Sequence, residues 1–388
     1  MEIERDPVTG HFKGGPKTLP SRDAAGHFLS CGGAGARVVP ESDTVRALKR
    51  EVADLRKQNR EQETLKSLFK IAVQDALEDL PRIEIPRKPT KRAKKQHEEI
   101  AVLHISDTQI GKVTPTYNSE VAGVRLLELA ERTIEIANTR RTAAKIDEIH
   151  VYLGGDVVEG EDIFPGQAHQ IDQSVFDQAI RSAPRMIAAV LLRLLEEFAI
   201  VRVFTVPGNH GRNGRYGGNA HPRTNWDNAA YAVLRTMLLG YPGNERRELR
   251  DRLTFVESED FYIVDRLWDW GVLLVHGDQI TGGFAGFPWY GAARKAWGWI
   301  DSIPEPWDYL YFGHFHTPAV AVLNHRMFLA NGTTESANQY AQAQLAAAGW
   351  PCQRLGFYNE SKGLIADHLV YLTDERRPNA DRFVAQDR

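Results

Sequence analysis

The sequence has few cysteines, almost no net charge and no long apolar run. Cys31 and Cys352 are its only cysteines in 388 residues, which excludes a disulfide framework and a cysteine-ligated zinc cluster. With 48 basic and 51 acidic side chains, the formal net charge of -3 excludes a uniformly basic coat, so contact with nucleic acid would need a local patch. No apolar run is long enough to span a bilayer, and the amino terminus has no secretory pattern. We expect a soluble, cytoplasmic protein that makes no membrane contact.

The amino-terminal quarter differs in composition from the remainder. Residues 1–40 are rich in Gly, Pro and small polar residues and predict a flexible leader. Over residues 41–80, apolar side chains recur at three- and four-residue spacing, which predicts an amphipathic helix. This helix would form a short homodimeric coiled coil, with Asn59 setting the register, or it would lie on its own catalytic domain. Residues 81–99 predict a basic linker, which would bind phosphates or stay solvated.

From residue 100 to about residue 373, strand-like runs alternate with helical patterns, and residues 374–388 form a tail. Asn118 or Ser119 would cap the first helix. Its expected apolar face consists of Val121, Val124, Leu127, Ala130 and Ile134. Further helices are predicted over 172–198, with a break at Pro184, and over 226–239. Later residues change to the two-residue period of strands, so the pattern predicts an α/β fold with two packed sheets and helices outside.

Five strand-like runs end in polar side chains that can bind a metal ion. These side chains are Asp107, Asp156, Asn209 followed by His210, His276, and His314 with His316. The carboxyl ends of parallel strands meet at one edge of a sheet, so we expect one centre there. Mixed nitrogen and oxygen donors favour Mn, with Fe, Zn or Mg as alternatives, and the set is large enough for two divalent ions. His210 would protonate a leaving oxygen or hold a phosphate.

Together these stretches resemble the five ordered sequence blocks of the calcineurin-like metallophosphoesterase superfamily. The blocks here are Asp107-Thr108-Gln109, Gly155-Asp156-Val157-Val158-Glu159, Gly208-Asn209-His210-Gly211, His276-Gly277-Asp278 and Gly313-His314-Phe315-His316. The resemblance implies a four-layer α/β/β/α sandwich of two mixed sheets. It implies one ion on Asp107, Gln109, Asp156 and His316, and a second on Asp156, Asn209, His276 and His314. It also implies that His210 is the catalytic histidine.

Gln109 departs from the family pattern, which usually has histidine at this position. A glutamine carbonyl oxygen is a neutral and weaker ligand than imidazole, so the first ion would bind loosely. Alternatively, Gln109 would only hydrogen-bond a metal-bound water. Of the two, we expect weak ligation.

The chain further resembles the nuclease branch of this superfamily, including the nuclease subunits of double-strand-break repair complexes and related phage-type phosphoesterases. Three features carry this looser likeness: the stretch 104–112, the loop 208–212 with its following helix, and Asn331-Gly332-Thr333. It implies a nuclease that cuts nucleic acid, with DNA favoured, and an ATPase partner that the sequence itself does not specify. Residues that follow the catalytic loop are candidates for binding substrate phosphates, namely Arg212, Arg215, His221 and Arg223.

Two alternatives remain at the level of sequence: a phosphodiesterase for cyclic nucleotides or other small esters, and a catalytically weak nucleic-acid-binding subunit. Other distinctive residues are assigned structural roles. His104 and His150 lie inside strand runs and are expected to be buried and hydrogen-bonded. Six tryptophans are expected in core or interdomain packing rather than in base stacking, and the loop-like stretch 287–290 is a candidate for lining a substrate cleft. These tryptophans are Trp226, Trp268, Trp270, Trp289, Trp297 and Trp299.

Overall fold

The computed structural model describes residues 86, 97–213, 221, 223–241, 244–281, 287–336 and 350–373. The predicted leader, the 41–80 helix, most of the basic linker and the tail lie outside the described residues. The described ranges therefore belong almost entirely to the predicted catalytic domain.

The first sheet is mixed and has six strands in the order β13-β12-β1-β2-β3-β6. Their bounds are β1 Glu98–Ile105, β2 Lys145–Leu153, β3 Ile200–Thr205, β6 Leu253–Glu257, β12 Cys352–Asn359 and β13 Gly363–Tyr371. Strands β1, β2, β3 and β6 run parallel, whereas β12 runs antiparallel to both β1 and β13. The parallel strands β1, β2 and β3 therefore deliver their carboxyl ends to the same edge.

The second sheet is also mixed and has the order β10-β11-β9-β8-β7. Its strands are β7 Tyr262–Leu267, β8 Trp270–Val275, β9 Tyr309–Phe312, β10 Ala319–Leu323 and β11 Arg326–Ala330. The central strands β8, β9 and β11 are parallel, and the outer strands β7 and β10 pair antiparallel to them. A separate pair is formed by β4 (Gly240–Tyr241) and β5 (Asn244–Glu245).

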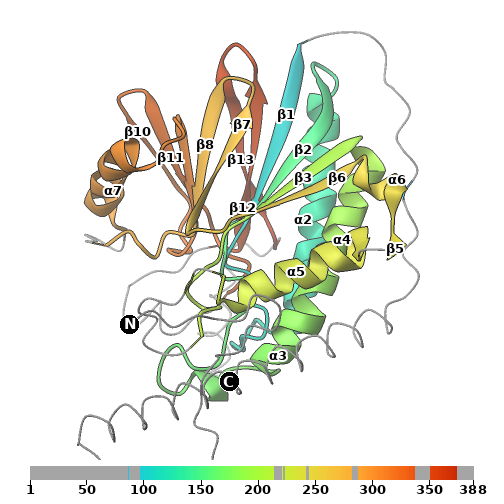
Figure 1. Ribbon diagram of the computed structural model, residues 1–388, viewed down its shortest axis with the longest axis vertical. Coiled ribbons are helices and arrows are strands. Elements are labelled where there is room, and N and C mark those ends of the chain that lie inside the picture. The colour runs from blue at the N-terminus through green and yellow to red at the C-terminus, as the bar shows by residue number, and fades with distance from the viewer. Residues whose placement is uncertain are drawn as a thin grey trace, which may run out of the picture. The chain divides into compact units, whose positions relative to one another are not determined.

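The longer helices are α2 Ser119–Arg140, α4 Ala183–Glu197, α5 Trp226–Leu239 and α7 Trp289–Ser302. The short ones are η1 Gln167–His169, α3 Val175–Asp177, the π-helical turn η2 Gln178–Ser182, and α6 Arg247–Arg250. Helices α2, α4 and α5 lie beside the first sheet, and α7 lies beside the second (Figure 1). None of the helices in the described ranges has the length and apolar character needed to cross a membrane.

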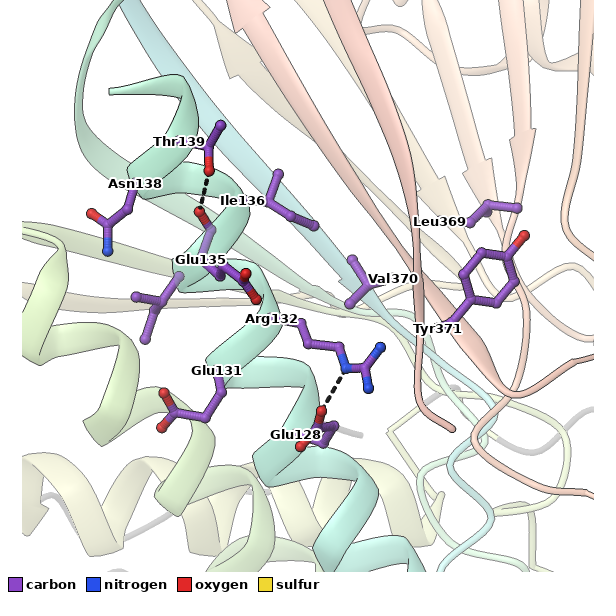
Figure 2. A pocket seen from close by; sticks show the side chains of 11 residues that line it. Glu128, Glu131, Arg132, Glu135, Ile136, Asn138, Thr139, Leu369, Val370 and Tyr371 are labelled. Atoms are coloured by element: carbon purple, nitrogen blue, oxygen red, sulfur yellow. Dashed lines mark hydrogen bonds and ion pairs between the residues drawn. The ribbon is translucent and has the colours of Figure 1, made fainter. Parts of the chain in front are cut away.

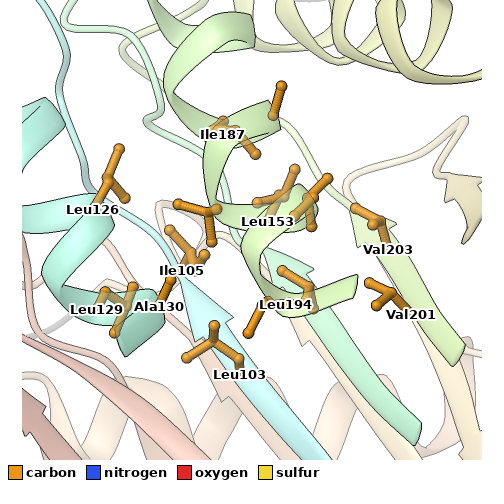
Figure 3. Close-up of a cluster of buried hydrophobic side chains, with 14 of the residues drawn as sticks. Leu103, Ile105, Leu126, Leu129, Ala130, Leu153, Ile187, Leu194, Val201 and Val203 are labelled. Atoms are coloured by element: carbon orange, nitrogen blue, oxygen red, sulfur yellow. The ribbon is translucent and has the colours of Figure 1, made fainter. Parts of the chain in front are cut away.

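Successive side chains along a strand point to opposite faces of its sheet, so each sheet packs against helices on one face and against the other sheet on the other face. In β1, Leu103 and Ile105 face the helices and pack with Leu126 and Leu194 (Figure 3), whereas Val102 belongs to the cluster between the sheets. Strand β8 alternates in the same way: Leu273 and Val275 pack in the cluster that includes residues of α7, and Val272 and Leu274 pack between the sheets. The α/β architecture with two mixed sheets is therefore confirmed, and its layers follow the predicted α/β/β/α order.

Helix α2 begins where the sequence predicts, but its predicted apolar face is partly wrong. Asn118 caps it by accepting a hydrogen bond from the N–H of Val121 at 2.9 Å. Val124 and Leu127 are exposed, however, and the buried face includes Leu126 and Leu129 instead. Aliphatic residues occur on both sides of this helix, so two overlapping three-and-four spacings compete, and only packing against the sheet selects one of them.

Two other helical stretches differ from expectation in detail. The 172–198 segment divides at the π-helical turn η2, and Pro184 is the second residue of α4, directly after that turn. The stretch 287–290 is only partly a loop, because Trp289 and Tyr290 start α7. Trp289 and Trp297 are exposed rather than core residues, whereas Trp299 is buried as predicted.

Candidate metal centre

Loops that follow five strands bring the predicted ligands together at one edge of the two sheets. Asp107 follows β1, Asp156 follows β2, and Asn209 follows β3. From the second sheet, β8 leads into His276, and β9 leads into the loop of His314 and His316. The parallel order of these strands explains why residues separated by about two hundred positions meet.

In one half of the centre, side-chain oxygens of two residues lie close to the ring of His276. The Nδ1 atom of His276 lies 2.9 Å from the carbonyl oxygen of Gly154, so this nitrogen is the N–H donor. The other ring nitrogen, Nε2, lies 3.0 Å from Asp156 Oδ2 and 3.1 Å from Asn209 Oδ1. Among the described residues, Asp156, His276 and His314 form the group of acidic or histidine side chains whose ligand atoms all lie within 4.8 Å of one another.

This half fits a divalent cation by the chemistry of its donors. Without an ion, burial lowers the pKa of His276 but Asp156 raises it well above its usual value, so the Nε2 proton lies between the two oxygens. A divalent cation can replace this proton, and the carboxylate, amide and imidazole groups then act as its ligands. Burial and the neighbouring His276 lower the pKa of His314 to about 4, which leaves the ring neutral and able to bind a metal ion. Burial alone would raise the pKa of Asp156, but His276 and His210 more than offset it, and the carboxylate stays ionised.

The other half is built differently around Asp107. Its Oδ1 accepts a hydrogen bond from the backbone N–H of His314 at 2.9 Å, and its Oδ2 accepts one from the Ser106 hydroxyl at 2.5 Å. His316 Nε2 lies 3.4 Å from Asp107 Oδ1. Both carboxylate oxygens are thus already engaged with protein donors.

Next to Asp107, three buried side chains and the part-buried His316 form a closed ring. Lys112 donates a hydrogen bond to Gln109 Oε1 at 2.8 Å, and Gln109 Nε2 lies 3.3 Å from His316 Nε2. His316 Nδ1 contacts Glu335 Oε1 at 2.6 Å, and Glu335 Oε2 returns to Lys112 at 2.8 Å. Burial would lower the pKa of Lys112, but Glu335 and Glu159 outweigh it and hold the ammonium charged. A fixed protein cation therefore lies beside the position predicted for the first ion.

His210 is held at the centre by two contacts. Its backbone N–H donates to Asp156 Oδ1 at 2.7 Å, and its ring Nδ1 lies 2.9 Å from the carbonyl oxygen of Glu159. The Glu159 carboxylate is buried, lies 3.2 Å from the same ring nitrogen, and accepts a hydrogen bond from Gln167 at 3.0 Å. Burial alone would lower the pKa of His210, but Glu159 and Asp156 raise it to about 9, so the ring carries a proton at neutral pH.

Sequence reasoning missed Lys112, Glu159, Asp227 and Glu335. Asp227, at the start of α5, accepts backbone hydrogen bonds from the loops that carry Asp156 and Asn209. An acidic residue in the first turn of a helix is common, and the N–H groups that Asp227 binds belong to other loops, so its role has no local signal. Glu335 has no local signal, since its role depends on a fold that returns it to Lys112.

The predicted phosphate-binding residues are only partly placed near the centre. Arg212 stands two residues after His210, and its positive charge lowers the pKa of Asp278, an effect that burial outweighs. Arg223 is exposed and pairs with Glu259 at 3.4 Å, and His221 is exposed beside it. Arg215 lies outside the described residues.

Backbone conformation marks the same residues independently of their chemistry. Non-glycine residues with positive φ in the described parts of the chain are Asp107, Gln109, Asp156, Trp268, His314, His316 and Asn324. Five of these seven are predicted ligands. Positive φ costs most residues free energy, and such strain concentrates at functional sites.

Of the two histidines expected to be buried and hydrogen-bonded, only one fits both parts of that prediction. His150 is buried and contacts Asp265 at 2.5 Å and Glu148 at 2.9 Å. His104 is fully buried, but neither of its ring nitrogens has a hydrogen-bond partner, and burial lowers its pKa to about 3. It is therefore a neutral packing residue against Tyr311.

A wide groove lies apart from the centre. It has a volume of about 1100 Å³ and runs between α2 and β13, where Glu128, Arg132 and Tyr371 line it (Figure 2). None of its lining residues is a predicted ligand. Its wide, charged lining offers no set of converging metal donors.

Comparisons with known proteins give only distant likenesses. The sequence matches no protein family profile and no curated protein. A predicted phosphoesterase of Streptococcus pneumoniae TIGR4 is 11% identical, with a TM-score of 0.27, over 71% of this chain and 99% of that one. The zinc complex of Vps29 from Entamoeba histolytica is 11% identical, with a TM-score of 0.31, over 70% and 99% of the two chains. A novel archaeal phosphodiesterase is 12% identical, with a TM-score of 0.32, over 69% and 99%. Likenesses this weak carry no argument about activity, which must come from the site itself.

Proposed function

We propose that this chain is a metal-dependent phosphodiesterase that hydrolyses phosphodiester bonds of nucleic acid, with DNA the favoured substrate. One observation carries the proposal. Asp156 Oδ2 and Asn209 Oδ1 both lie within hydrogen-bonding distance of His276 Nε2, and the backbone N–H of His210 binds the same aspartate. Hydrolysis of a phosphoester needs a cation to activate water and a general acid to protonate the leaving oxygen, and these residues can provide both.

When bound there, a divalent ion would supply Lewis-acid activation of a water and of a phosphate oxygen. The protein residues have separate tasks. His276 is oriented by Gly154 so that Nε2 faces the ion position. Asp156 presents Oδ2 to this position while Oδ1 holds the backbone of His210.

His210 is suited to act as the general acid. Because its Nδ1 is engaged by Glu159, the transferable proton is the one on Nε2. The raised pKa keeps this proton on the ring at neutral pH, so His210 would donate it to the leaving oxygen or hold a phosphate oxygen.

Aromatic side chains near the centre support a nucleic-acid substrate over a small ester. The ring of His314 contacts Phe315, with ring centroids 4.9 Å apart, and Phe315 contacts Phe287 at 5.5 Å. Phe287 in turn contacts Trp289 at 4.3 Å, and Trp289 and Tyr290 are exposed at the start of α7. Exposed aromatic rings that lead away from a phosphate site are suited to stacking successive bases.

A matched hydrolysis assay tests the proposal. Purified full-length protein with Mn²⁺ is given a labelled DNA duplex, a labelled single strand, and bis-p-nitrophenyl phosphate in parallel. His210→Ala should lower turnover by roughly 10²- to 10⁴-fold while the protein still binds Mn²⁺. The exposed His169→Ala is the matched control and should retain activity.

The assay separates the alternatives cleanly. Hydrolysis of only the small ester would replace the nucleic-acid substrate by a small-molecule one. Absence of turnover with all three substrates would overturn the enzymatic proposal and favour a binding subunit. Loss of Mn²⁺ in His210→Ala would show that this histidine acts on the metal site rather than as an acid.

A further inference from the structure

The two halves of the centre differ in the atoms that they present. Around His276, the oxygens of Asp156 and Asn209 meet an imidazole nitrogen that can bind a cation once it releases its proton. Around Gln109, the protein has already placed a cation, because the Lys112 ammonium lies 2.8 Å from Gln109 Oε1. This difference bears on how many ions the centre holds.

Lys112 determines which way the Gln109 amide points. An ammonium has only donors, so the amide must turn its oxygen toward Lys112 and its NH₂ group toward His316. In the reverse orientation, the NH₂ group of Gln109 would face the Lys112 ammonium, and two hydrogen-bond donors would oppose each other. An NH₂ group has no lone pair to give a metal ion, so Gln109 presents no ligand atom on the side that faces His316.

His316 is engaged in either of its protonation forms. Its Nδ1–H is donated to Glu335. In the neutral ring, Nε2 accepts from Gln109 at 3.3 Å, and in the charged ring it donates to Asp107 at 3.4 Å. The ring of Lys112, Gln109, His316 and Glu335 is satisfied without an ion.

Lys112 is held beside Gln109 by burial of its side chain and by two carboxylates. Its side chain is 9% exposed, it contacts Glu335 at 2.8 Å, and Glu159 lies 3.8 Å away. An ion bound to the remaining lone pair of Gln109 Oε1 would lie beside this ammonium in a buried setting, where like charges repel strongly. A second ion would therefore have to break the ring.

We propose that the centre holds a single divalent ion, on Asp156, Asn209, His276 and His314, and that Lys112 and Gln109 close the position of a second ion. The inference rests on the metal site of the proposed function but not on its substrate. Asp107 is then a positioning residue, whose carboxylate holds the backbone of His314.

The experiment counts ions in the full-length protein. After equilibration with Mn²⁺ and removal of free metal, elemental analysis should give one ion per chain, and electron paramagnetic resonance should show an isolated Mn²⁺ spectrum. The isosteric Gln109→Glu replaces the NH₂ group by an oxygen and keeps the contact to Lys112. This variant should bind a second ion and give an exchange-coupled spectrum.

A second variant tests the number of Mn²⁺ ions per chain without changing Gln109. Asp107→Asn should still bind one ion, whereas a two-ion centre would lose one on this change. Two ions with a coupled spectrum in the unmodified protein would overturn the proposal, and a Gln109→Glu protein that still holds one ion would overturn the role given to the amide. Metal count and hydrolysis are separate readouts, so a chain that binds one ion but cleaves nothing would remove the proposed function and leave this inference intact.

Discussion

The Asp227 carboxylate accepts a hydrogen bond from the backbone N–H of Asp156 at 2.9 Å. The same oxygen accepts one from the N–H of Gly208 at 2.8 Å, and the other oxygen accepts from Val157 and Val158 at 3.1 and 3.2 Å. A single side chain at the start of α5 therefore holds together the two loops that carry Asp156 and Asn209.

Removing this support should weaken metal binding without removing a ligand. In Asp227→Asn, an NH₂ group would face backbone N–H donors, so the loops would separate and the affinity for Mn²⁺ should fall by about 10- to 100-fold. Calorimetric titration with Mn²⁺ measures the change. Glu120→Gln alters an exposed acid in the first turn of α2 and should leave the affinity unchanged. Equal affinities in all three proteins would show that Asp227 only supports the fold.

Arg223 offers a test of a polymeric substrate. If it contacts a phosphate, Arg223→Ala should weaken binding of different DNA sequences to a similar extent and lower the slope of log affinity against log salt by about 1. Fluorescence anisotropy with a labelled strand over a range of salt concentrations measures both. Arg235 is the matched control, because it is equally exposed at 47% and also pairs with Glu257. The same slope in both variants would exclude the assigned phosphate contact.

The aromatic start of α7 makes a separate prediction about bases. Trp289→Ala should weaken binding of a single strand by about 1–3 kcal/mol while hydrolysis of bis-p-nitrophenyl phosphate is unchanged, because stacking needs a base. Trp350 is similarly exposed, at 52% against 48%, and contacts Tyr371 away from α7. Trp350→Ala should therefore bind normally. Loss of small-ester hydrolysis in Trp289→Ala would mean that the change had damaged the centre.

An ion pair that joins the two sheets predicts how stability depends on pH. His150 in β2 contacts Asp265 in β7, and burial, which lowers its pKa, is outweighed by Asp265 and Glu148. Because the folded pKa is raised, this stabilisation is fully present below pH 6.5, the ordinary pKa of histidine, and is lost as the pH rises through the folded value. Urea unfolding in EDTA should therefore show a free energy of unfolding that declines over this range.

Replacing the histidine should remove that pH dependence. His150→Gln cannot carry the charge. His150→Leu removes the cationic partner of the buried Asp265 carboxylate, which keeps hydrogen bonds from Tyr152 and Arg266, and should cost about 3–5 kcal/mol. His325→Gln, in the exposed turn between β10 and β11, should behave as the unmodified protein does. An unchanged pH profile in His150→Gln would assign the titration to another group.

Sequence periodicity predicted the parts of the fold that depend on local pattern. The ends of β1, β2, β3, β8 and β9 were predictable because buried strands are apolar runs and the next polar residue marks their edge. Helix α5 matches its predicted bounds because a capping asparagine and a following glycine delimit it. Helix α7 was missed, since its tryptophans and small residues carry no clear apolar stripe.

The surroundings of the ligands were less predictable than the ligands. Lys112 lies in a loop, and nothing local indicates that its long side chain turns inward to Gln109. Glu335 reaches the same lysine from more than two hundred residues away. Such partners are determined by tertiary structure. The sequence therefore predicts Gln109 as a metal ligand, whereas in the structure its side-chain amide accepts a hydrogen bond from Lys112.

The positive φ angles of Asp107, Gln109, Asp156, His314 and His316 have an evolutionary consequence. A left-handed backbone costs a residue with a side chain of order 1–3 kcal/mol, and glycine would avoid this cost at every one of these positions. Selection for a stable fold alone would therefore not retain a metal ligand whose side chain contributes little else. Asp107, Gln109, Asp156 and His316 offset this cost with hydrogen bonds, whereas the ring of His314 packs against His276 and Phe315. Libraries of random variants sorted only for thermal resistance should therefore accept glycine first at His314, and those proteins should have a lower affinity for metal.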